Sequence, residues 1–299
     1  MILCFDIGGS RIKAALAGPD GLRSLGDAPT PLGDFSAFLG VLAQFRHGHA
    51  VRAVAIAIAG VVEPETGRIR VANIPCADGR VLGAEILAAL GLPVLVLNDA
   101  DCFALAEARQ GAGRGHRNVF GVILGTGVGG GVVIDGRLVT GAGGYAGEWG
   151  HGPVLMTHAA GRDIPHFACG CGQSGCVDTV GGARGLERLY LHLNGSEMRS
   201  QDILEHWEAG DRAAGRVIEV WLALVAPPLA LVLNTLGSSI VPVGGGLSNV
   251  PALIAELDVA VRRMILRRTD TPLLVRAECR IEPGLIGAAE AGRAAFDLA

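Results

Sequence analysis

Two segments of the chain each consist of an apolar strand, a glycine-rich turn and a second apolar strand. The first opens the chain and turns at Gly8-Gly9-Ser10, and the second turns at Gly125-Thr126-Gly127. Because glycine has no Cβ, successive backbone N–H groups in such turns can converge on an anion. The same motif in each half of the chain favours two similar halves, each holding one side of a nucleotide. Ordinary tight hairpins are the alternative for either turn taken alone.

Strand and helix patterns alternate along the chain, which favours α/β layers over a helix bundle or a β-sandwich. We expect strands at Ile2–Ile7, Ile12–Ala17, Ala53–Ala59, Val94–Leu97, Val119–Leu124, Gly131–Ile134, Ser239–Val243 and Leu273–Ala277. We expect helices at Phe35–Phe45, Gly83–Leu90, Asp101–Gln110, Ala183–Leu193, Asp211–Leu233, Pro251–Leu266 and Leu285–Phe296. A glycine-rich break at Gly111–Gly115 separates a helix from the next strand, and the domain boundary is expected there.

Composition and charge narrow the class of partner. The chain has 299 residues, of which 50% are hydrophobic, so it can bury a full core, and its net charge is -4. The arginines are scattered rather than striped, so we expect a small-molecule partner and no nucleic acid. The longest apolar run, Trp221–Leu233, is interrupted by Pro227-Pro228, which favours a kinked core helix over a membrane span. With no charged leader at its start, the sequence predicts a soluble, cytoplasmic protein without a membrane partner.

A candidate general base follows the short apolar strand Val94–Leu97. Asn98-Asp99 stands at the carboxyl end of this strand, the edge at which open α/β sheets bind ligands. A carboxylate at this edge can accept the proton of a hydroxyl group that attacks the terminal phosphorus of ATP. Capping of the helix that follows is the competing role for Asn98, Asp99 and Asp101.

Cysteine spacing indicates a metal site. Three of the seven cysteines crowd together at Cys169, Cys171 and Cys176. Three thiolates and one imidazole form a closed tetrahedral zinc site, which is structural because no coordination position stays open. An odd number of cysteines in a chain expected to be cytoplasmic argues against a disulfide. The spacing leaves three histidines open as the fourth ligand: His151, His158 and His166.

Five motifs in one order resemble the signature of the ROK family of sugar kinases. They are Asp6-Ile7-Gly8-Gly9-Ser10, Asn98-Asp99-Ala100-Asp101, Gly125–Gly131, Glu148-Trp149-Gly150-His151 and the cysteine cluster. The resemblance covers the whole chain and is nearest to bacterial N-acetylglucosamine kinases. This nearer likeness is carried by Pro29-Thr30-Pro31, Asn73-Ile74-Pro75, Cys102–Leu105 and Val243–Asn249.

The resemblance implies a two-domain, actin-like ATPase fold of the ribonuclease-H-like type, with a ligand cleft between two α/β domains. The small domain is expected at residues 1–115 with a C-terminal helix at 285–299, and the large domain at 116–284. The implied activity is ATP-dependent phosphorylation of the 6-hydroxyl of N-acetyl-D-glucosamine. Dimers are common among similar kinases, so a homodimer is expected.

The resemblance also assigns roles residue by residue. Asp99 matches the catalytic base of the family, and His151 matches both a sugar contact and the fourth zinc ligand. The other residues that match sugar contacts are Gly60, Asn98, Glu148 and Asp178. Asp6 matches a residue near Mg²⁺, and the residues that match phosphate and adenosine contacts are Gly8, Gly9, Ser10, Arg11, Thr126, Gly127, Gly129, Gly130, Gly244, Gly245 and Gly246. Zinc is implied to fix the sugar loop, so its loss is expected to impair sugar binding and to spare the ATP contacts.

Three single residues and two short segments depart from the pattern of the family. Ser10 replaces threonine but keeps the hydroxyl, and Asp178 replaces glutamate with an arm that is one methylene shorter. Asp101 replaces asparagine and adds an acid near the presumed base. Gly237-Ser238-Ser239 stands where an acidic-proline turn is usual, and Ala59-Gly60 lacks the usual proline.

These departures bear on the choice of sugar rather than on the chemistry. A glucokinase or an N-acetylmannosamine kinase is the alternative within the class. A non-catalytic sugar sensor is the alternative outside it, although Asp99 and both phosphate turns are retained. The sugar-responsive repressors of the family carry an N-terminal helix-turn-helix, for which the strand expected at the start of this chain leaves no room.

Overall fold

The computed structural model describes residues 1–297 and divides into two compact units. The first unit comprises Met1–Gly111, Gly136–Ala146 and the chain from Cys279 onward; the second comprises Ala112–Asp135 and Gly147–Glu278. The first crossing between units therefore lies in the glycine-rich break. The short segment 136–146 carries no boundary signal in the sequence. Residues 298 and 299, which end the helix segment expected at 285–299, lie outside the described residues.

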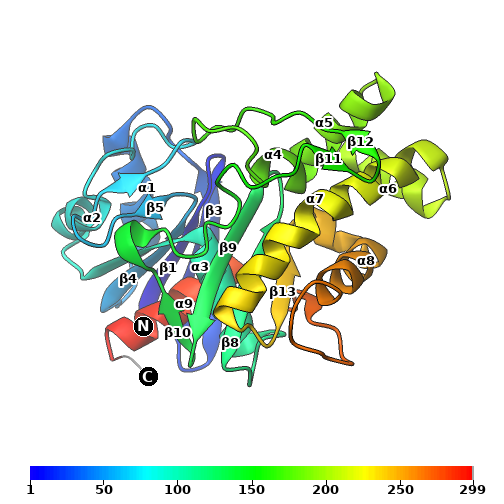
Figure 1. Cartoon of the computed structure of the whole chain (residues 1–299). Helices are drawn as coiled ribbons and strands as arrows, with labels where there is room; N and C mark the ends of the chain where they lie inside the picture. Colours follow the sequence, from blue (N-terminus) through cyan, green and yellow to red (C-terminus); the bar gives the residue numbers. More distant parts are fainter. Residues whose placement is uncertain (298–299) are drawn as a thin grey trace. The chain divides into compact units, whose positions relative to one another are not determined.

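The first unit is built on a five-stranded sheet with the order β3-β2-β1-β4-β7 (Figure 1). Its strands are β1 (Ile2–Ile7), β2 (Arg11–Gly18), β3 (Gly21–Pro29), β4 (Ala53–Ile58) and β7 (Val94–Asn98). β1 pairs antiparallel with β2, and Ile7 faces Ile12, which confirms the predicted hairpin at Gly8-Gly9. β1, β4 and β7 run parallel, and in register Ile7 faces Ile58, which faces Asn98. The segments that follow these three strands therefore emerge at one edge of the sheet.

Helices cover both faces of this sheet. They are α1 (Phe35–Arg46), α2 (Leu82–Leu90), α3 (Asp99–Gln110) and α9 (Pro283–Ala295), and the short elements of the unit are β5 (Val61–Val62), β6 (Ile69–Arg70), β10 (Arg137–Val139) and η1 (Ala142–Gly144). Because successive strand residues point to opposite faces, Leu3 and Phe5 join α1 and α2 in one buried cluster. Cys4 joins Cys102 of α3 and Ala288 of α9 in the other. The second cluster consists mostly of small side chains, so α3 and α9 pack closely (Figure 1).

The second unit contributes the strand order β9-β8-β13-β14 to its own sheet. These strands are β8 (Asn118–Leu124), β9 (Val128–Ile134), β13 (Val241–Gly244) and β14 (Leu274–Arg276), and a small hairpin adds β11 (His158–Ala159) and β12 (Arg162–Asp163). The helices are α4 (Asp178–Gly181), α5 (Ala183–Asn194), α6 (Ser200–Glu208), α7 (Arg212–Leu236), η2 (Gly246–Asn249) and α8 (Pro251–Arg262). In Figure 1, α7 runs across the face of β8 and β9, with α8 beside it.

Helix α7 continues through Pro227-Pro228 as one helix of 25 residues, where the sequence predicted a shorter, kinked one. Its Trp221 side chain is fully buried and donates a hydrogen bond from Nε1 to the carbonyl oxygen of Gly181, 3.2 Å away. By length and composition alone α7 could cross a membrane, but 56% of its apolar window is buried inside the protein. A core helix of a soluble protein has the same composition.

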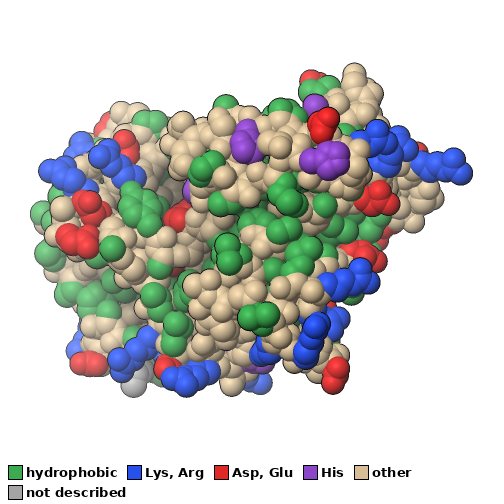
Figure 2. All heavy atoms as spheres, viewed as in Figure 1, with side chains coloured by type: hydrophobic (Ala, Val, Ile, Leu, Met, Phe, Trp, Pro, Cys, Tyr) green, Lys and Arg blue, Asp and Glu red, His purple; other side chains and the backbone are tan. Residues whose placement is uncertain are grey.

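Most expected strands and helices are confirmed within a few residues, and the differences have local causes. β3 is almost entirely exposed and lacks apolar alternation, so only its pairing with β2 reveals it. α6 is short and polar, and it was not expected. On the face drawn in Figure 2, Lys and Arg side chains lie in several separate groups rather than in one stripe.

Close packing between α3 and α9 generates a stability prediction. A Cβ built on Gly287 of α9 would overlap the backbone of Cys102 in α3, so Gly287→Ala must push the two helices apart. We expect Gly287→Ala to lower the free energy of unfolding by about 1–3 kcal/mol. Gly40, a helical glycine of α1 with open space around its Cβ direction, is the matched control. Gly40→Ala should stabilise by about 0.5–1 kcal/mol through helix propensity. Urea titration checks both, and a neutral Gly287→Ala would contradict the packing argument.

Candidate functional site

The turn between β1 and β2 is held by hydrogen bonds on both sides. Gly8 N–H donates to the carbonyl oxygen of Arg11 at 3.0 Å. Thr30, at the end of β3, donates its hydroxyl to Gly8 O at 2.7 Å and its N–H to Ser10 O at 3.1 Å. The Ser10 side chain is exposed, whereas the Arg11 guanidinium pairs with Asp27. The sequence assigned no role to Thr30, which fixes the shape of this turn.

Asp6, at the end of β1, is a half-buried carboxylate close to the start of α9. Burial raises the pKa of the Asp6 carboxyl, the Lys13 charge opposes this rise, and Glu282 adds to it. A Cβ on Gly284 would lie 2.7 Å from Asp6 Cγ, so the glycine lets the first turn of α9 approach the carboxylate. A single carboxylate beside a phosphate-binding turn suits Mg²⁺, which usually keeps several waters and binds substrate phosphates. Asp6 therefore fits the role that the resemblance gives it.

Asn98 ends β7 and Asp99 follows it, at the same edge of the first sheet. Asn98 caps α3: its Oδ1 accepts hydrogen bonds from Ala100 N at 2.8 Å and from Asp101 N at 3.3 Å. Its Nδ2 donates to the carbonyl oxygen of Gly60 at 3.0 Å. The sequence left open whether Asn98, Asp99 or Asp101 caps α3, and in the structure Asn98 is the N-cap. Asp99 lies in the first turn of the helix. Gly60 is also required by packing, because a Cβ there would lie 2.7 Å from Arg70 O.

In the second unit, the turn between β8 and β9 rests on the start of α5. Gly125 N–H donates to Gly127 O at 3.0 Å, and Ala183 N–H donates to Gly125 O at 2.8 Å. A Cβ on Gly182 would lie 2.6 Å from the Cα of Gly127, so the two backbones touch directly. Thr126 is exposed at the tip of the turn. This is the geometry of a turn whose outer N–H groups and hydroxyl can meet phosphate.

Gly129 and Gly130 lie in strand β9 rather than in the turn. Trp149 donates its Nε1–H to Gly129 O at 3.0 Å. A Cβ on Gly130 would lie 2.8 Å from Trp149 Cδ1 and 2.9 Å from Gly147 O. Packing of Trp149 against the strand therefore explains why glycine occupies position 130.

The segment that contains Trp149 also presents Glu148 and His151. The side chains of Glu148 and His151 are 30% and 35% exposed, and Glu148 Oε2 lies 3.7 Å from His151 Nε2. Burial is the largest cause that raises the pKa of the Glu148 carboxyl; His151 lowers it and Asp178 raises it further. A partly buried carboxylate of this kind can accept hydrogen bonds from sugar hydroxyls.

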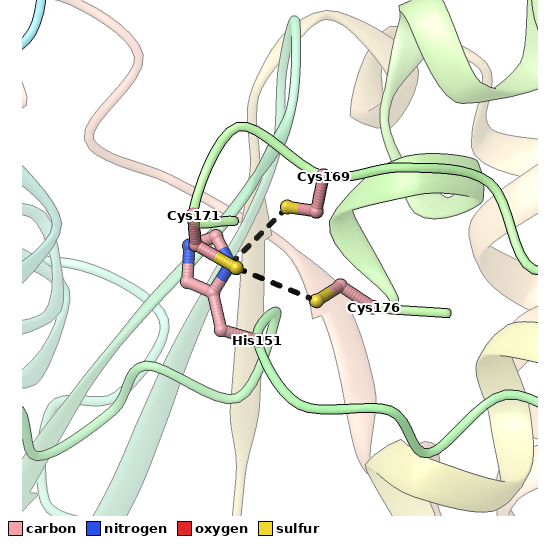
Figure 3. A group of neighbouring side chains, drawn as sticks. All are labelled: His151, Cys169, Cys171 and Cys176. Atoms are coloured by element: carbon pink, nitrogen blue, oxygen red, sulfur yellow. Dashed lines mark hydrogen bonds between the residues drawn. The ribbon is translucent and has the colours of Figure 1, made fainter. Parts of the chain in front are cut away.

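Figure 3 shows the side chains of His151, Cys169, Cys171 and Cys176 pointing toward one another. Their ligand atoms all lie within 4.8 Å of one another. Cys171 Sγ is 3.7 Å from Cys176 Sγ, and Cys169 Sγ is 3.6 Å from His151 Nδ1. Zinc with Zn–S bonds of about 2.3 Å in tetrahedral geometry spaces its sulfur ligands by about 3.8 Å. The four side chains therefore fit a zinc ion, with Nδ1 as the imidazole ligand.

The other two candidate histidines have different partners. His158 Nδ1 lies 2.8 Å from Asp163 Oδ1, and His166 Nε2 lies 2.7 Å from the carbonyl oxygen of Leu155. The structure therefore selects His151, which the spacing alone left open. With Nδ1 facing the cluster, His151 directs Nε2 toward Glu148, and a carboxylate in this place orients a zinc-bound imidazole.

The thiols of the cluster differ in acidity. The backbone N–H of Gln173 is the largest cause that lowers the pKa of the Cys171 thiol to about 7. Burial is the largest cause that raises the pKa of the Cys169 thiol, to about 12. Because a metal binds thiolates, Cys169 must lose its proton when the metal binds.

Asp178 stands between this cluster and the β8–β9 turn. Its Oδ1 accepts a hydrogen bond from Val128 N at 2.8 Å, and its Oδ2 lies 3.8 Å from Cys169 Sγ. Its own N–H donates to Gly150 O at 2.9 Å. The carboxylate oxygens of Asp178 therefore face the β8–β9 turn and the cysteine cluster.

A pocket of about 430 Å³ opens beside the β8–β9 turn within the second unit. It is lined by Gly125, Thr126, Ala183, Ser200, Gln201, Leu204, Glu205, Gly246, Leu247, Asn249 and Val250. Of the three glycines expected to face adenosine, Gly246 lines the pocket and Gly244 ends β13. Gly245 has a positive φ of 85°, and a Cβ there would overlap the backbone of Leu124. Gln201 and Glu205 were missed because α6 itself was not expected.

Comparison with known proteins identifies the class and then the family. The fold is that of actin-like ATPases, as in a ROK hexokinase from Thermus thermophilus, with a TM-score of 0.85, 30% identity and 99% of each chain covered. A ROK family glucokinase from Streptomyces griseus, solved with glucose and AMPPNP, has a TM-score of 0.74 and 28% identity, and covers 97% of this chain and 98% of its own. The ROK family model matches residues 2–293, so the chain belongs to the ROK family. The chain is also 38% identical to an N-acetyl-D-glucosamine kinase from Salmonella arizonae, over 97% of this chain and 98% of the relative.

The fit of the cluster to zinc generates a prediction about metal content. The wild-type protein should contain about one zinc per chain, and Cys169→Ser or Cys176→Ser should release it, since each ligand closes the same site. Cys76→Ser removes a cysteine outside the cluster and should retain the metal. Elemental analysis of the purified variants measures the content. A folded wild-type protein with far less than one zinc, prepared without chelators, would show that the cluster is not a zinc site.

Proposed function

We propose that the chain is an ATP-dependent kinase that transfers the terminal phosphoryl group of ATP to the 6-hydroxyl of N-acetyl-D-glucosamine. Likeness to N-acetyl-D-glucosamine kinases over nearly the full length of both chains is the observation that carries this proposal. A sugar as substrate and ATP as donor are further supported by the family and by its glucose and AMPPNP complex.

In the proposed reaction, four polar side chains hold the sugar. Glu148 accepts hydrogen bonds from sugar hydroxyls, and its half-buried position strengthens them. His151 orients the sugar through the edge of its ring while its Nδ1 belongs to the metal cluster. Asn98 is held by Ala100 N and Gly60 O, so its amide is already oriented before the sugar binds. Asp178 is the fourth sugar contact that the resemblance implies.

Asp99 accepts the proton of the 6-hydroxyl as its oxygen attacks the terminal phosphorus. This role is supported by its place in the first turn of α3, at the edge of the sheet where Gly8 also lies. Asn98 is the N-cap of α3, and Asp99 Oδ1 also accepts a hydrogen bond from Ala100 N at 2.9 Å, which holds the carboxylate at the start of the helix. Asp6 would hold Mg²⁺, which supplies neutralisation of the charge on the phosphates when bound.

The pocket beside the β8–β9 turn is where we place the adenosine. Gly246 lines the pocket without a side chain that would fill it, and Thr126 at the turn would lie where the adenosine meets the phosphates. Zinc, when bound, would hold His151 and the cysteine loop in one arrangement without taking part in the chemistry. A cytoplasmic location and a homodimer stay predictions from the sequence and the resemblance.

A coupled assay of ADP release tests the proposed substrate. We expect N-acetyl-D-glucosamine to have the highest kcat/KM among four sugars: N-acetyl-D-glucosamine, N-acetylmannosamine, glucose and mannose. A glucokinase or an N-acetylmannosamine kinase would rank its own sugar first, and a sugar sensor would release no ADP above background with any of them. Either result would overturn the assignment.

Substitution of Asp99 tests the base. Asp99→Asn keeps the shape of the side chain but removes its basicity, so kcat should fall by roughly 10²–10⁴-fold while sugar binding persists. Asp101→Asn, which changes the neighbouring acid to the residue usual in the family, is the matched control and should retain most of the activity. Steady-state kinetics and sugar titration of the two variants decide the matter. Near-normal turnover in Asp99→Asn would transfer the role to another group.

A further inference from the structure

Asp178 contacts three segments of the second unit that are separate in sequence. Its Oδ1 accepts from Val128 N at 2.8 Å, at the end of the β8–β9 turn. Its N–H donates to Gly150 O at 2.9 Å, next to His151. Its Oδ2 lies 3.8 Å from Cys169 Sγ. One short side chain therefore lies between the metal cluster and the turn proposed to hold phosphate.

The geometry points to Asp178 as a positioning residue, through which the Cys₃His cluster keeps the Gly125–Gly127 turn in its ATP-binding shape. This inference rests on the proposed function and adds to it a coupling between the metal site and nucleotide binding. It differs from the role of Asp178 as a sugar contact, which alone would not connect the metal to ATP.

The first half of the coupling is the short path from the cluster to Asp178. Cys176 is buried, its Sγ accepts a hydrogen bond from Gly152 N at 3.3 Å, and Val177 after it is fully buried. Thr179 closes the start of α4 with two bonds to Cys176 O, from its hydroxyl at 2.7 Å and from its N–H at 3.0 Å. A metal that fixes the Cys176 sulfur therefore also fixes the backbone from which Asp178 extends.

The second half is the fit between Asp178 and the turn. A Cβ on Gly127 would overlap Asp178 Oδ1, so the carboxylate occupies the place where any other residue at 127 would project. The Val128 N–H that Asp178 binds is thereby unavailable to phosphate and serves to shape the turn instead. Gly125 O is bound by Ala183 N, so the turn is held from α5 on one side and from Asp178 on the other.

This arrangement explains why an aspartate, rather than the longer glutamate, fits at position 178. The Asp178 backbone is tied to Gly150 O, which sets the distance from its Cα to Val128 N. An aspartate spans that distance with a hydrogen bond of normal length. The coupling also changes one expectation from the sequence: loss of zinc should weaken the binding of ATP as well as the binding of the sugar.

Binding of AMPPNP with Mg²⁺ to the zinc-loaded protein, measured by calorimetry without sugar, tests the inference. Asp178→Ala should weaken AMPPNP binding about fivefold or more, which is the loss expected for one shaping hydrogen bond. Asp178→Asn keeps a carbonyl oxygen toward Val128 N and should stay within about twofold of wild type. Thr235→Val, which removes a side-chain hydrogen bond to the backbone in α7, outside this path, is the matched control and should also stay within about twofold.

Two further measurements distinguish the loss of a positioned turn from general damage to the fold. Zinc content should be unchanged in all three variants, and hydrogen exchange in the peptide that contains Val128 should accelerate in Asp178→Ala alone. The inference fails if Asp178→Ala binds AMPPNP as the wild type does, or if Thr235→Val weakens binding equally. If the wild-type protein phosphorylates its sugar and Asp178→Ala keeps full AMPPNP affinity, the inference is overturned but the proposed function stands. A wild-type protein that neither binds AMPPNP nor phosphorylates any sugar overturns the proposed function.

Discussion

Direct backbone contact between Gly127 and Gly182 is the constraint on which the candidate site of the second unit depends. A side chain on Gly182 would drive the β8–β9 turn away from α5, and a side chain on Gly127 would overlap the carboxylate of Asp178. Because the contact places the start of α5 against the turn, the residues that precede α5 must also lie close to the turn. α4 and the cysteine loop therefore lie next to the turn, and Asp178 can reach Val128. The positions of the metal cluster and the pocket beside the turn therefore depend on this one backbone contact.

The first unit positions its functional groups by a different physical device. Hydrogen-bonded register aligns the ends of β1, β4 and β7, which brings the Gly8 turn, Gly60 and Asn98-Asp99 to one edge. Small side chains between α3 and α9 then fix the helix that carries Asp99. Backbone pairing and close packing are rigid, so these groups are oriented before any ligand is bound. The second unit lacks such a frame around its cysteine loop and relies on side-chain ligands for the same purpose.

The sequence predicted the features that depend on local residue patterns, and it missed those that depend on contacts with residues distant along the chain. Strand β1 was predicted to the residue, and β2 to within one residue at each end, because glycine and apolar runs mark this hairpin. β3 was missed because an exposed strand needs no apolar pattern once β2 pairs with it. Three members of the candidate metal cluster followed from cysteine spacing, whereas the spacing alone did not select His151, since His158 and His166 lie nearer to Cys169 along the chain. Thr30 and Asp178 act through hydrogen bonds to distant backbone, for which a single sequence carries no signal.

Two of the carboxylates proposed to serve ligands are kept where their charge is unfavourable. Burial raises the pKa of Asp6 and of Glu148, so the folded protein holds their protons more tightly than the unfolded chain does. Their contribution to stability is therefore fully present below the ordinary pKa of an acid and is lost as the pH rises through the raised value. Above the raised pKa values both groups are ionised at some cost to folding. In the proposed complex, a cation at Asp6 and sugar hydroxyls at Glu148 would offset that cost.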